Sequence, residues 1–226
     1  MPQKVKKSGH FVKPTLDPIF QLWGWILLAW SLYRHFFNLP EWADELVFKP
    51  LIFVIPVLWY VRRIERKRLE SVGITSKNLF NSLYIGLGFG LVFAVEGLLL
   101  NISKNSTLVI NPIQAFREYG MLLLFILSLA TAVSEEILNR GFLFTRIFEK
   151  SKSLYYSLGM ATLLFVLLHV PALVTTLKLE GLTLVIFFLT TGMLGFLNNL
   201  LMYNTRSIVA PILVHVFWNM TVALFF

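Results

Sequence analysis

The sequence has no cysteine among its 226 residues. A disulfide framework and a thiolate metal site are therefore excluded, and any catalytic group has to be a carboxylate, an imidazole, a hydroxyl or an amine. Charge is also scarce, because only 14% of the residues are Asp, Glu, Lys or Arg, whereas a soluble domain has about a quarter. The sequence contains no low-complexity segment and no repeat at a fixed period.

Apolar sequence is abundant: 57% of the residues are hydrophobic and the mean hydropathy is +0.72. A helix needs about 20 apolar residues to cross a bilayer core of roughly 30 Å. Seven blocks approach this length, at residues 19–37, 46–61, 80–100, 120–148, 154–175, 181–204 and 208–225. The second block is short and contains Pro56. The sequence therefore predicts an all-α fold, a polytopic transmembrane helix bundle of about seven spans in the cell membrane.

The basic residues predict how this bundle is oriented. Fifteen of the 20 Lys and Arg residues lie on the side of the amino terminus, so the positive-inside rule places that terminus in the cytoplasm and the carboxyl terminus outside. The net charge of +8 thus reflects orientation, and nucleic acid is not an expected partner. We expect residues 1–18 to form a basic cytoplasmic tail and residues 19–226 a single transmembrane bundle. The first block lacks a small-residue cleavage site and is expected to be retained.

Few ionisable side chains fall inside the predicted spans, where each is costly unless it is paired or hydrated, and each is therefore a candidate functional residue. They are Glu96 in the third span, Glu135, Glu136 and Arg140 in the fourth, His169 in the fifth and His215 in the seventh, with Asn219 as a neutral companion.

Helical spacing indicates which of these residues cooperate. Residues four apart share one face, so Glu136 can pair with Arg140, while Glu135 is rotated away by about 100°. His215 and Asn219 have the same four-residue spacing. At 1.5 Å per residue, the polar groups of the three spans fall near one depth. The alternatives without function are a buried ion pair that fixes helix register and histidines that hydrogen-bond neighbouring helices.

Further absences narrow the chemistry. The only aspartates, Asp17 and Asp44, lie outside the spans, so a membrane aspartyl pair is excluded. No glycine is followed two positions later by serine, and the zinc signature His-Glu-x-x-His is absent. Glutamate and histidine remain.

We expect Glu136 to pair with Arg140, and Glu135, assisted by His169, to take a proton from water. His215 and Asn219 would donate hydrogen bonds to the developing oxyanion, worth roughly 3 kcal/mol per donor. This version requires no cofactor. A zinc version is equally open, with His169, His215 and either Glu135 or Glu136 as ligands and the other glutamate as base.

Three motifs carry a specific resemblance. EEILNRG, with Glu135, Glu136 and Arg140, resembles the EExxxR motif of the CAAX-protease and bacteriocin-processing (ABI) family, which includes the type II CAAX prenyl proteases. FVLLHVP, with His169, resembles the family's FxxxH motif, and APILVHVFWN, with His215 and Asn219, resembles its HxxxN motif. The match covers about residues 120–222.

This resemblance implies a membrane bundle with a cavity among these spans, and an intramembrane endopeptidase whose site comprises Glu135, Glu136, Arg140, His169, His215 and Asn219. The implied substrates are membrane-associated peptides or lipidated proteins, either prenylated CAAX-type tails or bacteriocin and leader peptides. Asn139 stands where the family usually has an aromatic residue, and we expect it to alter the substrate pocket.

Two other functions are compatible with the motifs. One is a catalytically silent family member that acts as a membrane scaffold or regulator. The other is a proton-coupled carrier, in which intramembrane glutamates and histidines relay protons, although the paired broken helices of such carriers are not apparent. The expected surroundings are a lipid bilayer, and the small size favours a prokaryotic plasma membrane. The sequence makes no prediction of oligomeric state.

Overall fold

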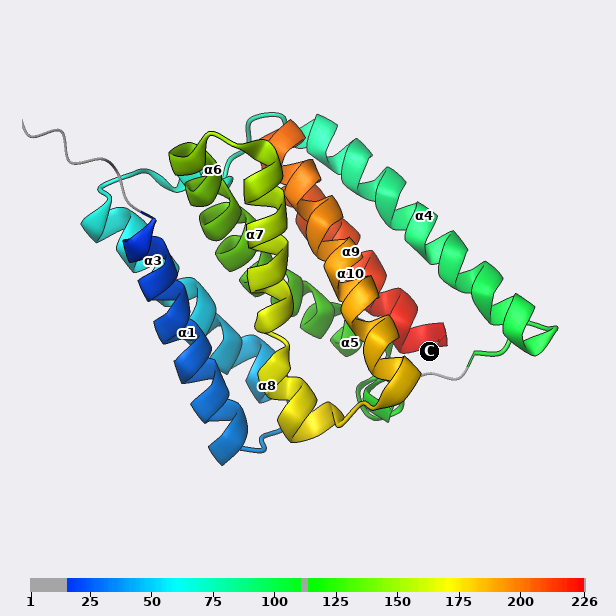
Figure 1. Cartoon of the computed structure of the whole chain (residues 1–226). Helices are drawn as coiled ribbons and strands as arrows, with labels where there is room; N and C mark the ends of the chain where they lie inside the picture. The colour runs from blue at the N-terminus through cyan, green and yellow to red at the C-terminus, as the bar shows by residue number, and fades with distance from the viewer. Residues whose placement is uncertain (1–15, 111–113, 226) are drawn as a thin grey trace, which may run out of the picture.

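The computed structural model describes residues 16–110 and 114–225, and every regular element in that part of the chain is helical (Figure 1). The elements are α1 (Asp17–Phe36), α2 (Glu41–Ala43), η1 (Asp44–Phe48), η2 (Pro50–Val54), α3 (Ile55–Trp59), η3 (Tyr60–Ile64), η4 (Leu69–Val72), α4 (Leu79–Asn105), α5 (Gln114–Glu136), η5 (Ile137–Phe144), α6 (Thr145–Ser151), α7 (Leu154–Leu167), α8 (Val170–Ala172), η6 (Leu173–Leu177), α9 (Gly181–Thr205) and α10 (Val209–Phe225).

Apart from η4, these elements join into seven helical rods within the described residues, which are in chain order α1, α2 to η3, α4, α5 to α6, α7 to η6, α9 and α10. The predicted all-α membrane bundle is confirmed. The rods coincide with the seven apolar blocks, but the second begins at Glu41 and not at residue 46. Pro56 does not end this rod. It lies in α3 between the π-helical segments η2 and η3, and the wider turns of such segments accommodate the change in the hydrogen-bond ladder that proline imposes.

Four helices in the described part of the chain are long and apolar enough to cross a membrane, namely Leu79–Asn105, Gly120–Ser151, Leu154–Leu177 and Gly181–Thr205. Val209–Phe225 is a shorter apolar helix. The chain is thus a multi-pass membrane protein, while the count of seven spans, the orientation and the single-bundle division stay predictions. Residues 1–15 of the predicted basic tail lie outside the described residues.

The rods pack in two apolar clusters. The larger joins α1, the second rod, η5 and α7 through side chains such as Trp30, Phe53 and Phe142. The smaller joins α4, α9 and α10 through Phe93, Leu194 and other residues. Figure 1 shows α4 at one edge of the bundle beside α10, with α1 at the opposite edge. Many large apolar side chains remain exposed around the bundle, as expected for a surface in contact with lipid.

One buried arginine ties the loop after the second rod to the bundle. The guanidinium of Arg146 in α6 binds both carboxylate oxygens of Glu65, with Nε–O distances of 2.9 and 2.8 Å. It also donates to the backbone carbonyl and the hydroxyl of Ser71, at 3.0 and 2.9 Å. Because the charge and all of these donors are satisfied, Arg146 can be almost fully buried at this end of the bundle.

Glycines let α4 approach α10 closely. A Cβ atom added at Gly90 would lie 2.4 Å from Cδ2 of Phe217, and one at Gly86 would lie 3.0 Å from the Cα of Ala210. Small residues at such contacts are how helices associate in a bilayer, where no hydrophobic force draws them together. The Gly86–Gly90 spacing in the sequence is thus explained by helix packing.

Substitution of Gly90 by alanine is therefore expected to lower the thermal unfolding temperature, because overpacking of this kind costs about 1–3 kcal/mol. Gly88→Ala is the matched control, since nothing lies within 4 Å of a Cβ atom at Gly88 and alanine favours helix by about 1 kcal/mol. Thermal unfolding of both variants in the same detergent is the measurement. Equal unfolding temperatures for the two variants would contradict the close α4–α10 contact.

Candidate active site

The two adjacent glutamates lie at the junction of α5 and η5, deep in the bundle. Glu135 is 7% exposed and Glu136 is fully buried. From Ile137 to Phe144 the helix is π-helical, a local widening that is frequent at functional sites. Gly141 admits a close neighbour here, because a Cβ atom at this position would lie 2.7 Å from the carbonyl oxygen of Val72.

Glu136 is the point at which three helices meet. Its Oε1 accepts hydrogen bonds from Nη1 of Arg140 at 3.1 Å, from Nδ2 of Asn198 in α9 at 3.0 Å and from Nδ1 of His215 in α10 at 2.7 Å. The predicted Glu136–Arg140 pair is therefore present. The Arg140 guanidinium also lies over the Phe165 ring of α7, 4.1 Å from its centroid, which adds a cation–π contact.

Glu135 has a cation of its own. Its Oε1 accepts a hydrogen bond from Nζ of Lys49 at 2.9 Å, and the same ammonium lies 2.8 Å from Oε2 of Glu45. Glu45 in turn accepts a hydrogen bond from the Thr131 hydroxyl. The sequence predicted an ion pair only for Glu136, whereas the second rod brings Lys49 to Glu135 from a distant part of the sequence.

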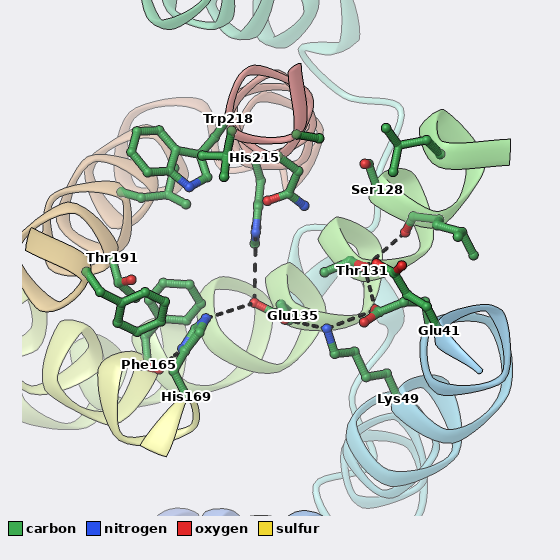
Figure 2. A pocket seen from close by; sticks show the side chains of 18 residues that line it. Glu41, Lys49, Ser128, Thr131, Glu135, Phe165, His169, Thr191, His215 and Trp218 are labelled. Atoms are coloured by element: carbon green, nitrogen blue, oxygen red, sulfur yellow. Dashed lines mark hydrogen bonds and ion pairs between the residues drawn. The ribbon is translucent and has the colours of Figure 1, made fainter. Parts of the chain in front are cut away.

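Two imidazoles face the other oxygen of Glu135. Nε2 of His169 and Nε2 of His215 each lie 3.9 Å from Glu135 Oε2 (Figure 2). The opposite ring nitrogens are occupied: Nδ1 of His169 is 2.9 Å from the Phe165 carbonyl, and Nδ1 of His215 is bound to Glu136. Since a carbonyl or carboxylate oxygen only accepts, both Nδ1 atoms carry the proton, and in the neutral rings both Nε2 atoms keep a lone pair.

His169 reaches this position from a break in its helix. It lies in the turn between α7 and α8, immediately before Val170 and Pro171. Proline disfavours helix for the residue before it and cannot donate a backbone hydrogen bond, so a regular helix does not continue through this segment. The His169 side chain is 25% exposed, toward the pocket.

A cavity of about 320 Å³ adjoins these groups. Figure 2 shows the side chains of Glu135, His169 and His215 pointing toward one another at its wall, with Lys49 on the other side of Glu135. The lining residues are Glu41, Glu45, Lys49, Leu124, Leu127, Ser128, Thr131, Glu135, Phe165, His169, Phe187, Thr191, Leu194, His215, Trp218, Asn219, Val222 and Ala223.

The structure brings five of the six predicted site residues into one hydrogen-bonded or ion-paired cluster: Glu135, Glu136, Arg140, His169 and His215. The sixth, Asn219, lines the same cavity, but no hydrogen bond joins it to His215 within the described residues. Glu136 and Arg140 lie behind the cavity wall and contact it only through other residues. Glu96 is exposed on α4 and lines a separate apolar groove.

Asn139, which we expected to alter the substrate pocket, does not line the cavity. Asn139 is fully buried behind the cavity, and its Nδ2 donates to the backbone carbonyl of Glu135 at 2.8 Å. The amide nitrogen is thus satisfied by the helix itself, while Oδ1 has no hydrogen-bond partner within the described residues.

The sequence interpretation missed two residues of the cluster. Lys49 lies inside the second apolar block, four positions after Glu45, and should have been counted as an ionisable residue within a span. Asn198 stands in the Asn-Asn pair of the sixth block, and such polar pairs in an apolar segment indicate hydrogen bonds between helices.

The cluster matches a zinc ligand set in its atom types but not in its spacing. Tetrahedral zinc with bonds of about 2.1 Å places neighbouring ligand atoms about 3.4 Å apart. Both Nε2–Oε2 distances are 3.9 Å, and the described residues contain no group of three or more His, Cys, Asp or Glu side chains placed to hold a metal ion. No step of the chemistry below is assigned to a metal.

The helical membrane bundle with buried carboxylates and imidazoles at the wall of a cavity defines an intramembrane protein with a glutamate–histidine site. Residues 117–221, which contain all six predicted site residues, match the family model of the type II CAAX prenyl endopeptidase Rce1-like proteins. This match confirms the resemblance of that part of the chain to the CAAX-protease family. Comparison with curated proteins and with solved structures gave no match.

Asn198 offers a test of the buried cluster. Asn198→Ala removes donors to Glu136 and to the Pro211 carbonyl, at 3.0 and 3.2 Å, and leaves buried acceptors without them. We expect a loss of about 1–3 kcal/mol, or several degrees in thermal unfolding temperature, since a chain of this size loses about 2–4 °C per kcal/mol.

Asn204→Ala is its control on the same helix, because Asn204 is exposed and donates only to the Leu200 carbonyl, at 2.8 Å. Thermal unfolding of both variants in detergent checks this prediction. An Asn198→Ala protein as stable as the Asn204→Ala protein would argue against the three-helix contact at Glu136.

Proposed function

We propose that the protein is an intramembrane endopeptidase in which Glu135 and His169 activate a water molecule for attack on a peptide bond. The match of residues 117–221 to the CAAX prenyl endopeptidase family model supports the reaction class. The observation that carries the proposal is the convergence of Glu135 Oε2 with two imidazole Nε2 atoms beside a cavity.

The geometry of these acceptors suits a bound water. Glu135 Oε2 and an imidazole Nε2 with a lone pair cannot hydrogen-bond each other directly, and they lie 3.9 Å apart. A water molecule about 2.8 Å from each can donate to both. Lys49 holds the other oxygen, Oε1, at 2.9 Å. Oε2 is buried and has no hydrogen-bond partner within the described residues, so it is free to receive a proton.

Hydrolysis then follows in two steps. Glu135 takes one proton from the water while the water oxygen bonds to the peptide carbonyl carbon, and the carbonyl oxygen becomes an oxyanion. The same proton passes to the amide nitrogen, the carbon–nitrogen bond breaks, and the products are a carboxylic acid and an amine. Asn219, on the cavity wall, is assigned to donate a hydrogen bond to the oxyanion.

The role of His215 differs from the one expected from the sequence. Its Nδ1 proton is committed to Glu136, so Nε2 can donate to an oxyanion only when the ring is protonated. Because the two protons of the water are directed to Glu135 and His169, we assign His215 to donate a hydrogen bond to the oxyanion when its ring is protonated.

The cavity indicates what kind of substrate is bound. Its walls include the apolar side chains of Leu127, Phe187, Leu194 and Val222. These suit apolar peptide side chains or an attached lipid, so the proposed substrates are prenylated CAAX-type tails or bacteriocin and leader peptides. A catalytically silent scaffold or regulator and a proton-coupled carrier are the alternatives.

The first test replaces the proposed base. Glu135→Gln keeps the side-chain shape and an oxygen for Lys49 but cannot accept the proton, so kcat/KM should fall by at least about 10²-fold. Purified proteins are incubated with libraries of isoprenylated and unmodified peptides, and products are identified by mass spectrometry. Glu96→Gln is the matched control, because Glu96 is exposed on α4, and it should cleave at the wild-type rate.

Equal cleavage by the wild-type and Glu135→Gln proteins would defeat the assignment, and no cleavage by either would favour the silent scaffold. Elemental analysis of the active protein distinguishes the zinc version: stoichiometric zinc, together with loss of activity in strong chelators, would favour it over the metal-free proposal.

A second test addresses Lys49. Lys49→Met leaves Glu45 and Glu135 without their shared cation, so kcat should fall by about tenfold or more, and removal of one partner from a buried pair costs about 3–5 kcal/mol of stability. Lys49→Arg should restore part of kcat because it keeps the charge. The control is Lys67→Met, because Nζ of Lys67 forms a comparable ion pair, 2.8 Å from Oε2 of Glu149, on the surface. Unchanged kcat in Lys49→Met would remove Lys49 from the mechanism.

A further inference from the structure

The two ends of the bundle differ in charge. One end, which we call the basic end, carries the start of α1, the loop after η3, the end of α6 and the turn before α10. In Figure 1 this end lies near the label α6. The opposite end carries the end of α1, the loop after α4, η6 and the end of α10, near α8 in the same view.

Ten Lys and Arg residues of the described chain lie at the basic end: Arg62, Arg63, Arg66, Lys67, Arg68, Lys77, Arg146, Lys150, Lys152 and Arg206. Four lie at the opposite end: Arg34, Lys104, Arg117 and Lys178. Loops rich in Lys and Arg remain in the cytoplasm, so this difference assigns the basic end to the cytoplasmic side.

The cavity extends from the site toward the opposite end. The second rod runs away from that end and contributes its first residues, Glu41 and Glu45. The helix that starts at Gly120 contributes five residues between Leu124 and Glu135 inclusive. The last helix, α10, runs toward that end and contributes His215 and then residues as far as Ala223. Each of these three rods thus lines the cavity with its half nearest the opposite end.

Toward the basic end the interior is filled. All eight residues from Ile137 to Phe144 are buried, and the guanidinium of Arg140 occupies the space directly behind the site. A separate cavity of about 200 Å³ at the basic end is lined by Glu70, Ser71, Gly73, Phe144, Thr145, Phe148, Glu149, Met202 and Arg206, and by no residue of the site.

From these observations we infer that the site is entered from the non-cytoplasmic face of the membrane. The inference rests on the proposed function for the nature of what enters: its substrate class is an apolar polypeptide segment presented at that face, as in an exported peptide or the outer segment of a membrane protein. Of the two substrate classes proposed above, this favours bacteriocin and leader peptides, because a prenylated tail exposed in the cytoplasm would meet the filled side of the bundle and not the cavity.

The absence of cysteine makes this inference directly testable, because a single introduced thiol is the only one in the chain. Thr107→Cys places it on an exposed residue at the opposite end, and Ser76→Cys on an exposed residue at the basic end. Ser128→Cys places it in the cavity wall. Each variant is treated in intact cells with a membrane-impermeant thiol reagent, a maleimide for the loops and a small methanethiosulfonate for the cavity.

Thr107→Cys and Ser128→Cys are expected to react in intact cells, whereas Ser76→Cys should react only after the membrane is opened. The cysteine-free wild type controls for background labelling. The inference is overturned if Ser76→Cys reacts from outside and Thr107→Cys does not. It is also overturned if Thr107→Cys reacts from outside while Ser128→Cys requires opened membranes or stays unreactive.

Vesicles of known orientation separate this inference from the proposed function. An impermeant peptide cleaved in detergent should be cleaved by right-side-out vesicles and not by inside-out vesicles. Cleavage by inside-out vesicles alone would overturn the inference and leave the endopeptidase proposal standing. Absence of cleavage in detergent would contradict the endopeptidase proposal, while the thiol labelling would still decide which face the cavity opens to.

Discussion

The buried carboxylate of Glu136 is the interaction on which the site depends. One of its oxygens accepts hydrogen bonds from Arg140, Asn198 and His215, and so joins the fourth rod to α9 and α10. Burying an unpaired carboxylate would be prohibitive, but a charge that meets a guanidinium and two further donors can be held without solvent. Its removal would leave Arg140 as an unpaired buried cation and His215 without an orienting partner.

Glu136 therefore divides the work between the two neighbouring acids. By occupying Nδ1 of His215, it leaves Nε2 facing Glu135, just as the Phe165 carbonyl does for His169. Glu135 is held separately by Lys49, which comes from the second rod and lies outside residues 117–221, the part that matches the family model. The amino-terminal half thus contributes a charge to the site.

The sequence predicted those features that depend on local order along the chain. Long apolar blocks require helices in a membrane, and residues four apart share a face, so the seven rods and the Glu136–Arg140 pair followed directly. Contacts between rods were not predictable in this way. Lys49 and Asn198 join the cluster only because their helices pack beside the fourth rod, and nothing in their spacing relates them to the glutamates. Composition also made Glu96 a candidate, although its spacing offered it no partner and it is exposed on the outside of α4.

The protonation of the two imidazoles is the most direct measure of this arrangement. Nitrogen-15 chemical shifts of labelled histidine, assigned with His169→Ala and His215→Ala variants in lipid, distinguish the two neutral tautomers. The account predicts that both neutral rings carry the proton on Nδ1, and that Glu136→Gln changes the signals of His215 more than those of His169. Protons on Nε2 in both neutral rings would mean that lone pairs do not face Glu135, and would contradict the account.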